Sequence, residues 1–208
     1  MKNTLKKPLS AYSAVILDMD GTLYFQAPVR FFVLLDMLLH FWSIREFLII
    51  QKYRKLYERG LTDHERFAKL PSDAPHIVNK WMLLRPMKYV RKFRDRALLS
   101  LIKTLHSKNI RIIVYSDYPL KNKLEATDLE PDFAYYAGDE IISCQKPDPK
   151  GLLNIIADLG EKPENIAFIG DRYEKDGLCA DNAGVDCVIL PKSVRRRCEI
   201  YKIIGGSL

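Results

Sequence analysis

Four short apolar runs along the chain have the composition of buried strands. They are rich in Val and Ile, which favours strands that are covered on both faces and run parallel. The runs span residues 13–17, 110–115, 165–169 and 186–190. Helical periodicity marks residues 95–107, 120–127, 150–159 and 174–183. This alternation of strand and helix predicts an α/β fold with a doubly wound, mainly parallel sheet.

The segment from residue 28 to residue 93 breaks this alternation. It holds no strand-like run, and its helical periodicity is interrupted only by glycine and proline. These residues are Gly60, Pro71, Pro75 and Pro86. We therefore expect a helical insertion over residues 28–93, placed within a discontinuous domain of residues 1–27 and 94–208.

Residues 31–50 are the most hydrophobic part of this insertion. Their length raises the question of a membrane span, but charged residues such as Asp36 lie among them, and charges inside a span are costly. Asp36, His40 and Ser43 follow at i, i+4 and i+7 and form a narrow polar stripe, which would set specificity if it faced the site. The remaining apolar surface needs cover from other helices, a partner subunit or a lipid surface. We expect packing within the chain, and a homodimer stays open.

Composition narrows the class of protein. The formal charge is +7, hydrophobic residues make up 48% of the chain, and charges of both signs are mixed, which excludes a disordered or fibrous chain. A positive field attracts anionic substrates. Zinc-finger spacing and aromatic-basic interleaving are absent, so we expect no nucleic-acid partner. The four cysteines form no C-x-x-C pair, in keeping with reduced thiols. We expect a cytoplasmic protein without a membrane partner.

The first apolar run ends in two carboxylates, at Asp18 and Asp20. Side chains two apart on an extended chain point the same way, so this pair can share a site, and Gly21 permits the tight turn that follows. Open α/β sheets bind ligands at the carboxyl ends of their strands. Two acids this close favour a divalent cation such as Mg2+. An ionised Asp18 can attack phosphorus and form an aspartyl phosphate. Asp20 can protonate the leaving oxygen and then activate water, provided that the site raises its pKa.

Three further motifs follow in chain order. Ser116 ends the second run, where its hydroxyl suits a phosphate oxygen. Lys146 lies in a proline-rich loop, and its ammonium can neutralise phosphate and nucleophile together. The third run ends in Gly170 and Asp171, a candidate cation ligand, and Asp176 can hold the cation indirectly. Each motif alone is ordinary, but the set at one sheet edge predicts a phosphoryl-transfer site.

These residues resemble the four signature motifs of the haloacid dehalogenase superfamily, above all the Asp-x-Asp-Gly-Thr sequence at residues 18–22. The resemblance implies a Rossmann-like three-layer α/β/α core, with a helical cap between the first and second motifs. It implies Mg2+ held by Asp18, the backbone carbonyl of Asp20 and Asp171, and phosphate bound by Ser116 and Lys146. Supporting positions are Gly21, Thr22, Asp117, Gly170 and Asp176. Relatives often have Asn where this chain has Asp117, so the contacts of that residue stay open.

The sequence therefore predicts a Mg2+-dependent phosphatase that hydrolyses a small phosphorylated metabolite through an aspartyl phosphate. The family's haloalkanoate-cleaving branch lacks an acid equivalent to Asp20, which argues against dehalogenation. Two alternatives remain. A phosphomutase or phosphotransferase acting on a sugar phosphate would use the same nucleophile. A non-catalytic scaffold could use the apolar helix to bind a partner or a membrane, although the retained acidic positions argue against it.

Overall fold

The chain folds into two compact units. The computed structural model describes residues 5–39, 43–142 and 144–205. One unit, called the core unit below, comprises residues 1–25 and 94–208, and the other, called the helical insert, comprises residues 26–93. The first helix of the insert begins at Gln26, two residues before the boundary expected from the sequence.

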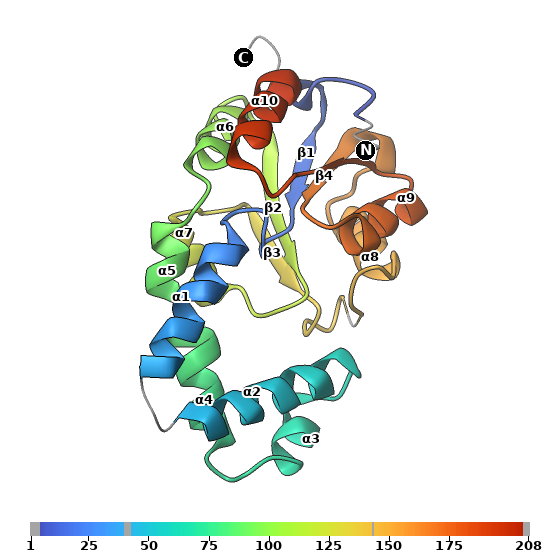
Figure 1. Cartoon of the computed structure of the whole chain (residues 1–208). Helices are drawn as coiled ribbons and strands as arrows, with labels where there is room; N and C mark the ends of the chain where they lie inside the picture. Colours follow the sequence, from blue (N-terminus) through green and yellow to red (C-terminus); the bar gives the residue numbers. More distant parts are fainter. Residues whose placement is uncertain (1–4, 40–42, 143, 206–208) are drawn as a thin grey trace. The chain divides into compact units, whose positions relative to one another are not determined.

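The core unit is built on a five-stranded parallel sheet in the order β3-β2-β1-β4-β5 (Figure 1). The central strand β1 (Ala14–Leu17) pairs with β2 (Arg111–Ser116) on one side and β4 (Ile166–Gly170) on the other. The edges are β3 (Phe133–Tyr136) and β5 (Asp186–Ile189). All five strands run in the same direction, so the predicted α/β class and mainly parallel sheet are confirmed.

The register aligns the carboxyl ends of the three central strands. Leu17 at the end of β1 lies opposite Val114 on β2 and Ile169 on β4. Residues that follow these strands therefore emerge at one edge of the sheet. The sequence analysis does not predict β3, because an edge strand need not be continuously apolar. Phe133 is exposed there, and of the four residues of this strand only Tyr135 is buried.

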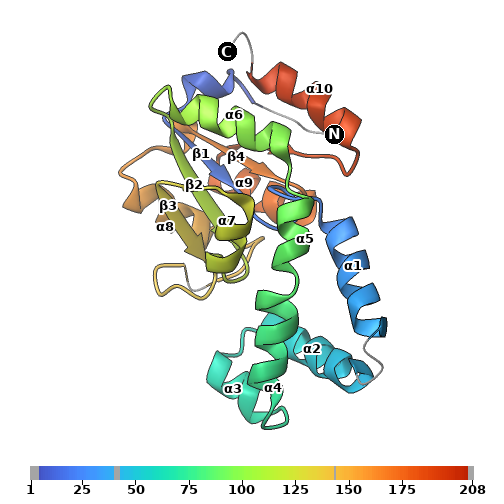
Figure 2. The same ribbon diagram turned by 90° about the vertical axis from the view of Figure 1, so that its left-hand side faces the viewer.

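Helices cover both faces of the sheet and complete the predicted three layers (Figures 1 and 2). On one face lie α8 (Lys150–Asp158) and α9 (Leu178–Ala183), which bury Leu152, Ile155, Cys179 and Ala180 against the strands. On the other face lie α6 (Arg96–His106) and α10 (Val194–Gly205). The remaining elements are α7 (Lys121–Thr127), the 3₁₀ turns η1 (Leu9–Ala11) and η3 (Pro163–Asn165), and the π turn η4 (Tyr173–Gly177).

Every element described in the helical insert is a helix. They are α1 (Gln26–Leu39), α2 (Ser43–Glu58), α3 (Asp63–Ala68), α4 (Ala74–Val78), the π-helical segment η2 (Asn79–Leu84) and α5 (Met87–Lys92). A small core of its own holds them together, in which Trp81 and Ile77 pack against Ile49 and Ile50 of α2. Burial of such side chains is the main source of helix stability in a segment this short.

The polar stripe expected on the first helix of the insert is only partly described. Asp36 forms an ion pair with Lys88 on α5 at 2.9 Å. His40 and the side chain of Ser43 lie outside the described residues, so a role of the stripe in specificity stays a prediction. Within the described ranges, no helix combines the length and the hydropathy that crossing a bilayer requires.

Candidate active site

Asp18 is the first residue after β1 and lies buried at the carboxyl edge of the sheet. Its backbone N–H continues the pairing with β4 by donating to the carbonyl of Ile169 at 2.9 Å. One oxygen of its carboxylate accepts a hydrogen bond from Thr22 at 3.2 Å. The other lies 2.5 Å from the ammonium of Lys146. The strand and these two partners fix the carboxylate at one place and in one orientation.

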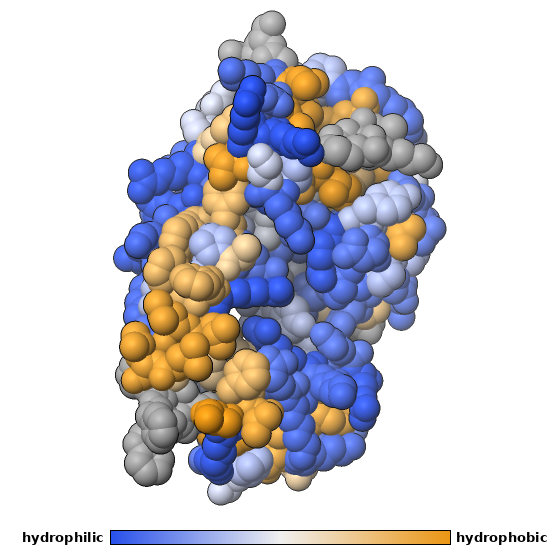
Figure 3. Space-filling model, in the orientation of Figure 1, coloured by the Kyte–Doolittle hydropathy of each residue, from blue (hydrophilic) through white to orange (hydrophobic). Residues whose placement is uncertain are grey.

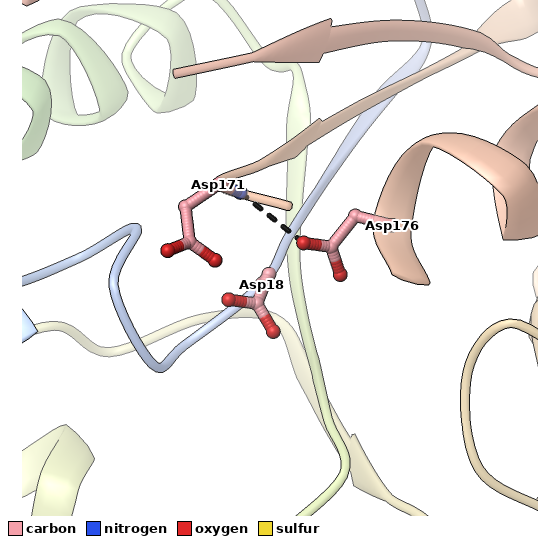
Figure 4. Close-up of side chains that lie close together, drawn as sticks. All are labelled: Asp18, Asp171 and Asp176. Carbon is pink, nitrogen blue, oxygen red and sulfur yellow. Dashed lines mark hydrogen bonds between the residues drawn. The ribbon is translucent and has the colours of Figure 1, made fainter. Parts of the chain in front are cut away.

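Two further carboxylates converge on Asp18 (Figure 4). Asp171 directly follows β4, and Asp176 lies in the π turn η4. Oxygens of the three carboxylates lie within 4.8 Å of one another. Asp176 also accepts the backbone N–H groups of Asp171 and Arg172, at 3.2 and 3.1 Å, which holds the chain after β4 in a tight turn. Lys146 contacts this cluster a second time, at 2.7 Å from Asp176.

The carboxylates of this cluster are poorly compensated by the protein itself. Burial raises the pKa of Asp18 above its ordinary value, and the neighbouring Asp176 adds to the rise. Burial, again with Asp176, raises the pKa of Asp171 to about 6. Burial alone would lower the pKa of Lys146, but Asp18, Asp176 and Asp117 outweigh it and hold that pKa well above the usual value. Lys146 is therefore a fixed cation among several acids.

The donor set fits a hard divalent cation. Such ions take carboxylate oxygens as ligands, and oxygens of three carboxylates lie within 4.8 Å of one another here, two of them paired with Lys146. Asp171 supplies a further sign, because its buried Oδ1 has no hydrogen-bond partner and its nearest cation, the guanidinium of Arg172, lies 3.9 Å away. A buried anionic oxygen without a partner is costly, and a bound cation would remove that cost.

Asp20 is not one of the three acids of this cluster. Lys123 on α7 contacts both of its carboxylate oxygens, one at 2.7 Å and the other at 2.5 Å, and the hydroxyl of Tyr24 donates to the same carboxylate. Burial would raise the pKa of Asp20, but Lys123 and Tyr24 lower it overall. The sequence analysis made the general-acid role conditional on a raised pKa. That condition is not met in the arrangement described here.

Ser116 and Asp117 lie at the end of β2, and both are buried. The hydroxyl oxygen of Ser116 accepts the backbone N–H of Tyr118 at 3.1 Å, which leaves its own proton available to another acceptor. Asp117 accepts the backbone N–H of Lys146 at 3.0 Å and the ammonium of Lys175 at 2.7 Å. Asp117 thus ties the loop that carries Lys146 to the end of β2.

Two glycines are required by close approach at the site. Gly21 has φ of 98°, and a Cβ there would lie 2.2 Å from Oδ2 of Asp171. A Cβ at Gly170 would lie 2.4 Å from the Cβ of Asp176. Any larger residue at either position would displace a carboxylate of the cluster. These contacts explain the place of both glycines in the motifs.

A buried network around Arg197 was not predicted from the sequence. Arg197 on α10 is 2% exposed and donates to the backbone carbonyls of Gly21 and Thr22, at 2.5 and 3.1 Å. It also pairs with Asp95 at 3.1 Å, and Asp95 accepts the hydroxyl of Tyr201 at 2.7 Å. Arg197, Tyr201 and Ile204 are buried at i, i+4 and i+7 of α10, so helical phase could have separated Arg197 from the exposed Arg195 and Arg196. Lys123 was missed in the same way, on the buried side of α7.

A doubly wound sheet with a buried carboxylate, further acids and a buried lysine at its carboxyl edge is the architecture of an α/β enzyme. The family model described as haloacid dehalogenase-like hydrolase matches residues 12–184. The chain belongs to this hydrolase family, as the resemblance of its motifs predicts.

Individual relatives agree with this assignment. Phosphoglycolate phosphatase 1 of Pseudomonas aeruginosa is 40% identical over 58 residues, and the match covers 28% of this chain but only 21% of that protein. A haloacid dehalogenase-like hydrolase of Bacteroides fragilis is 20% identical, with a TM-score of 0.58 over 91% of this chain and 93% of its own. The CbbY protein of Rhodobacter sphaeroides, solved with xylulose 1,5-bisphosphate, is 18% identical with a TM-score of 0.58 over 88% of both chains. At these identities the solved structures establish a shared fold.

Proposed function

We propose that the protein is a Mg2+-dependent phosphatase that hydrolyses a small phosphorylated metabolite of the cytoplasm through an aspartyl phosphate on Asp18. The observation that carries the proposal is the convergence of Asp18, Asp171, Asp176 and Lys146 at the carboxyl edge of the sheet. Relatives named as phosphatases of phosphorylated small molecules support the same substrate class.

Binding of the phosphate is assigned to two side chains. Lys146 already neutralises Asp18, so an incoming dianion and an anionic nucleophile can share one ammonium. The hydroxyl of Ser116 can donate to a second phosphate oxygen, because its proton is not used in the hydrogen bond that it accepts from Tyr118. Asp18, Asp171 and the backbone carbonyl of Asp20 would hold Mg2+, with Asp176 beside them. The bound ion would offset the negative charge of the nucleophile and of the phosphoryl oxygens.

The chemistry then proceeds in two displacements. In the first, an oxygen of Asp18 bonds to phosphorus, the bond from phosphorus to the ester oxygen breaks, and that oxygen takes a proton from Asp20. In the second, Asp20 accepts a proton from water, the water oxygen bonds to phosphorus, and the bond to Asp18 breaks. The carboxylate of Asp20 paired with Lys123 is in the ionised form that the second displacement needs. The first displacement requires Asp20 to leave Lys123 and carry a proton.

In this proposal the helical insert is the family's cap, which selects the substrate. Its support is the position of residues 26–93 in the chain, between the motif after β1 and the motif at the end of β2. Caps of this kind exclude water during the reaction and contact the part of the substrate that is not transferred.

An aryl phosphate assay tests the proposal. We expect turnover that requires Mg2+ and that falls at least about 10³-fold in Asp18→Asn, because the amide cannot attack phosphorus. Asp158→Asn is the matched control, since this exposed aspartate on α8 only accepts a hydrogen bond from Tyr135. Turnover that survives Asp18→Asn would refute the mechanism. Transfer of the phosphoryl group to an added sugar phosphate in preference to water would replace hydrolysis by a phosphotransferase activity.

A further inference from the structure

The helical insert exposes a continuous apolar stripe on α1. Phe31, Leu34, Leu35, Leu38 and Leu39 recur at the spacing of one helix face, and each is exposed. Leu38 and Leu39 are 68% and 74% exposed. Single exposed apolar residues are ordinary, but a patch of this extent marks a surface that contacts something apolar. Figure 3 shows hydrophobic side chains gathered over α1 and the beginning of α2.

The exposed face of α2 is apolar at its beginning and basic further along the helix. The first half of its exposed face carries Ile44 and Leu48, 71% and 62% exposed. At the following positions of that face, i+7, i+8 and i+11 from Ile44, stand Gln51, Lys52 and Lys55. Together with Arg54 and Glu58, these three residues line a shallow hollow. The opposite face of α2 is buried in the insert's core. An apolar surface thus borders a basic one on the same helix.

The net charge of the chain resides in the insert. Residues 26–93 contain 13 Lys and Arg against six Asp and Glu, a formal charge of +7. The rest of the chain contains 20 of each sign and is formally neutral. The positive charge and the exposed apolar stripe belong to the same unit. A partner that matches both features is apolar and anionic at once.

We propose that the face formed by α1 and the exposed side of α2 binds the surface of an anionic phospholipid membrane. The leucine and phenylalanine side chains would enter the boundary between headgroups and acyl chains, while Lys52, Lys55 and their neighbours contact the anionic headgroups. This is attachment in the plane of the interface, and it needs no helix that spans the bilayer. A second copy of the chain is the less favourable occupant, because pairing this face with itself would bring two units of charge +7 together.

Sedimentation with vesicles tests the proposal on the full chain. We expect the protein to sediment with vesicles of phosphatidylcholine containing 30% phosphatidylglycerol at low salt, and to stay in the supernatant with phosphatidylcholine alone. Binding should weaken at least about fivefold at 1 M NaCl, where the Debye length is about 3 Å. Recovery of the protein in the supernatant with both vesicles at low salt would overturn the proposal.

Two substitutions and a matched control locate the contact. Leu38→Glu should lower the partition coefficient at least about tenfold, since it removes apolar contact and adds a like charge to the anionic surface. Lys55→Glu should lower it about fivefold or more, which reports the basic half. Ile203→Glu is the control, because Ile203 is 76% exposed on α10 of the core unit. Equal binding by Leu38→Glu and wild type would overturn the proposal.

Helical circular dichroism of each variant shows whether it folds, and all three positions are exposed, so we expect unchanged spectra. Sedimentation equilibrium without lipid separates the alternative occupant. A dimer that Leu38→Glu dissociates, together with no vesicle binding, would assign the face to a second copy and refute the membrane.

Discussion

In the core unit several charged side chains are buried beside opposite charges, whereas in the helical insert charged side chains lie almost entirely at the surface. Among the charged side chains described as buried, eight belong to the core unit and one, Arg66, to the insert. The core unit is formally neutral, and the insert carries the whole excess of +7. Burying a charge is costly unless it is paired, so most buried charges of the core lie beside an opposite charge. The insert is free of that constraint.

This difference separates two tasks. Chemistry on a phosphate needs groups held at fixed distances in a site with little water, which the edge of a parallel sheet supplies. Recognition of a surface or of a variable substrate needs exposed area and long-range charge, which a small helical unit can supply without a large core. The predictions below test whether the two units respond to charge removal as differently as their burial implies.

The largest contrast is expected between the ion pairs Arg197–Asp95 and Arg45–Asp73. Arg197→Met should lower the free energy of unfolding by about 3 to 5 kcal/mol, because it strands Asp95 and the carbonyls of Gly21 and Thr22 in the interior. Arg45→Met should lower it far less, since the pair with Asp73 is exposed although its N–O distance is 2.6 Å. Urea titration measures both. Equal losses would show that burial does not determine how much these ion pairs contribute to the free energy of unfolding.

The second contrast concerns activity and compares Lys146 with Lys80 of the insert. Lys146→Met should lower kcat/KM for an aryl phosphate by about 10² to 10³-fold, since the phosphate and Asp18 lose their shared cation. Lys80→Met should change it by about twofold or less, because its partner Glu46 lies in the insert. Steady-state kinetics of the two variants provide the measurement. A comparable loss in Lys80→Met would mean that the insert supplies a group to the reaction.

How far the sequence predicts this molecule differs between the same two units. The apolar runs predict four of the five strands because central parallel strands are buried on both faces, and the edge strand at Phe133 escapes that rule. The motifs predict the neighbourhood of Asp18, since strand ends of a parallel sheet meet at one edge. The carboxylate of Asp176 lies within 4.8 Å of those of Asp18 and Asp171, and its expected indirect role toward the cation stays a prediction.

Partners that come from distant helices are harder to predict. Lys123 and Arg197 each stand beside other basic residues, and a run of like charges is typical of a solvated helix face. Only their helical phase, together with knowledge of which face meets the sheet, identifies them as buried. In the insert the expectation of packing within the chain does not account for the exposure of Leu38 and Leu39, because periodicity shows that a face is apolar and not what covers it.

The third prediction uses the cation. A saturating excess of Mg2+, at about 100 times its dissociation constant, should stabilise the folded chain by about 2.7 kcal/mol and raise its melting temperature by about 5 to 10 °C. Asp171→Asn should abolish most of this rise, because it removes an oxygen of the carboxylate cluster. Asp73→Asn in the insert should keep the full response, since Asp73 is paired with Arg45. A thermal melt with Mg2+ or EDTA measures the shift. A rise that persists in Asp171→Asn would place the ion elsewhere.

The smallest effect is expected for two carboxylates, one in each unit, whose substitution should change the free energy of unfolding by similar amounts. Asp186 on β5 accepts a hydrogen bond from the hydroxyl of Tyr12 at 2.6 Å. The ammonium of Lys80 lies 3.0 Å from each carboxylate oxygen of Glu46 on α2. Burial would raise the pKa of either carboxyl, but hydrogen bonds lower it overall from the ordinary values of 3.8 and 4.5. They come from Tyr12 and Lys6 for Asp186, and from Trp81 and Lys80 for Glu46. A carboxyl whose folded pKa is depressed stabilises the fold above its unfolded pKa, and that contribution is lost as the pH falls through the folded pKa.

Asp186→Asn and Glu46→Gln should therefore each cost about 1 kcal/mol at pH 7, and the cost should shrink as the pH falls below about 4. Urea titrations of wild type and variants at pH 7 and at pH 3 give the difference directly. The partners remain in place in both variants, so each amide keeps one acceptor oxygen and loses the negative charge and the second acceptor. A cost that grows toward low pH in either variant would reverse the sign derived from these contacts. A cost confined to Asp186→Asn would extend the contrast between the two units to this pair of carboxylates.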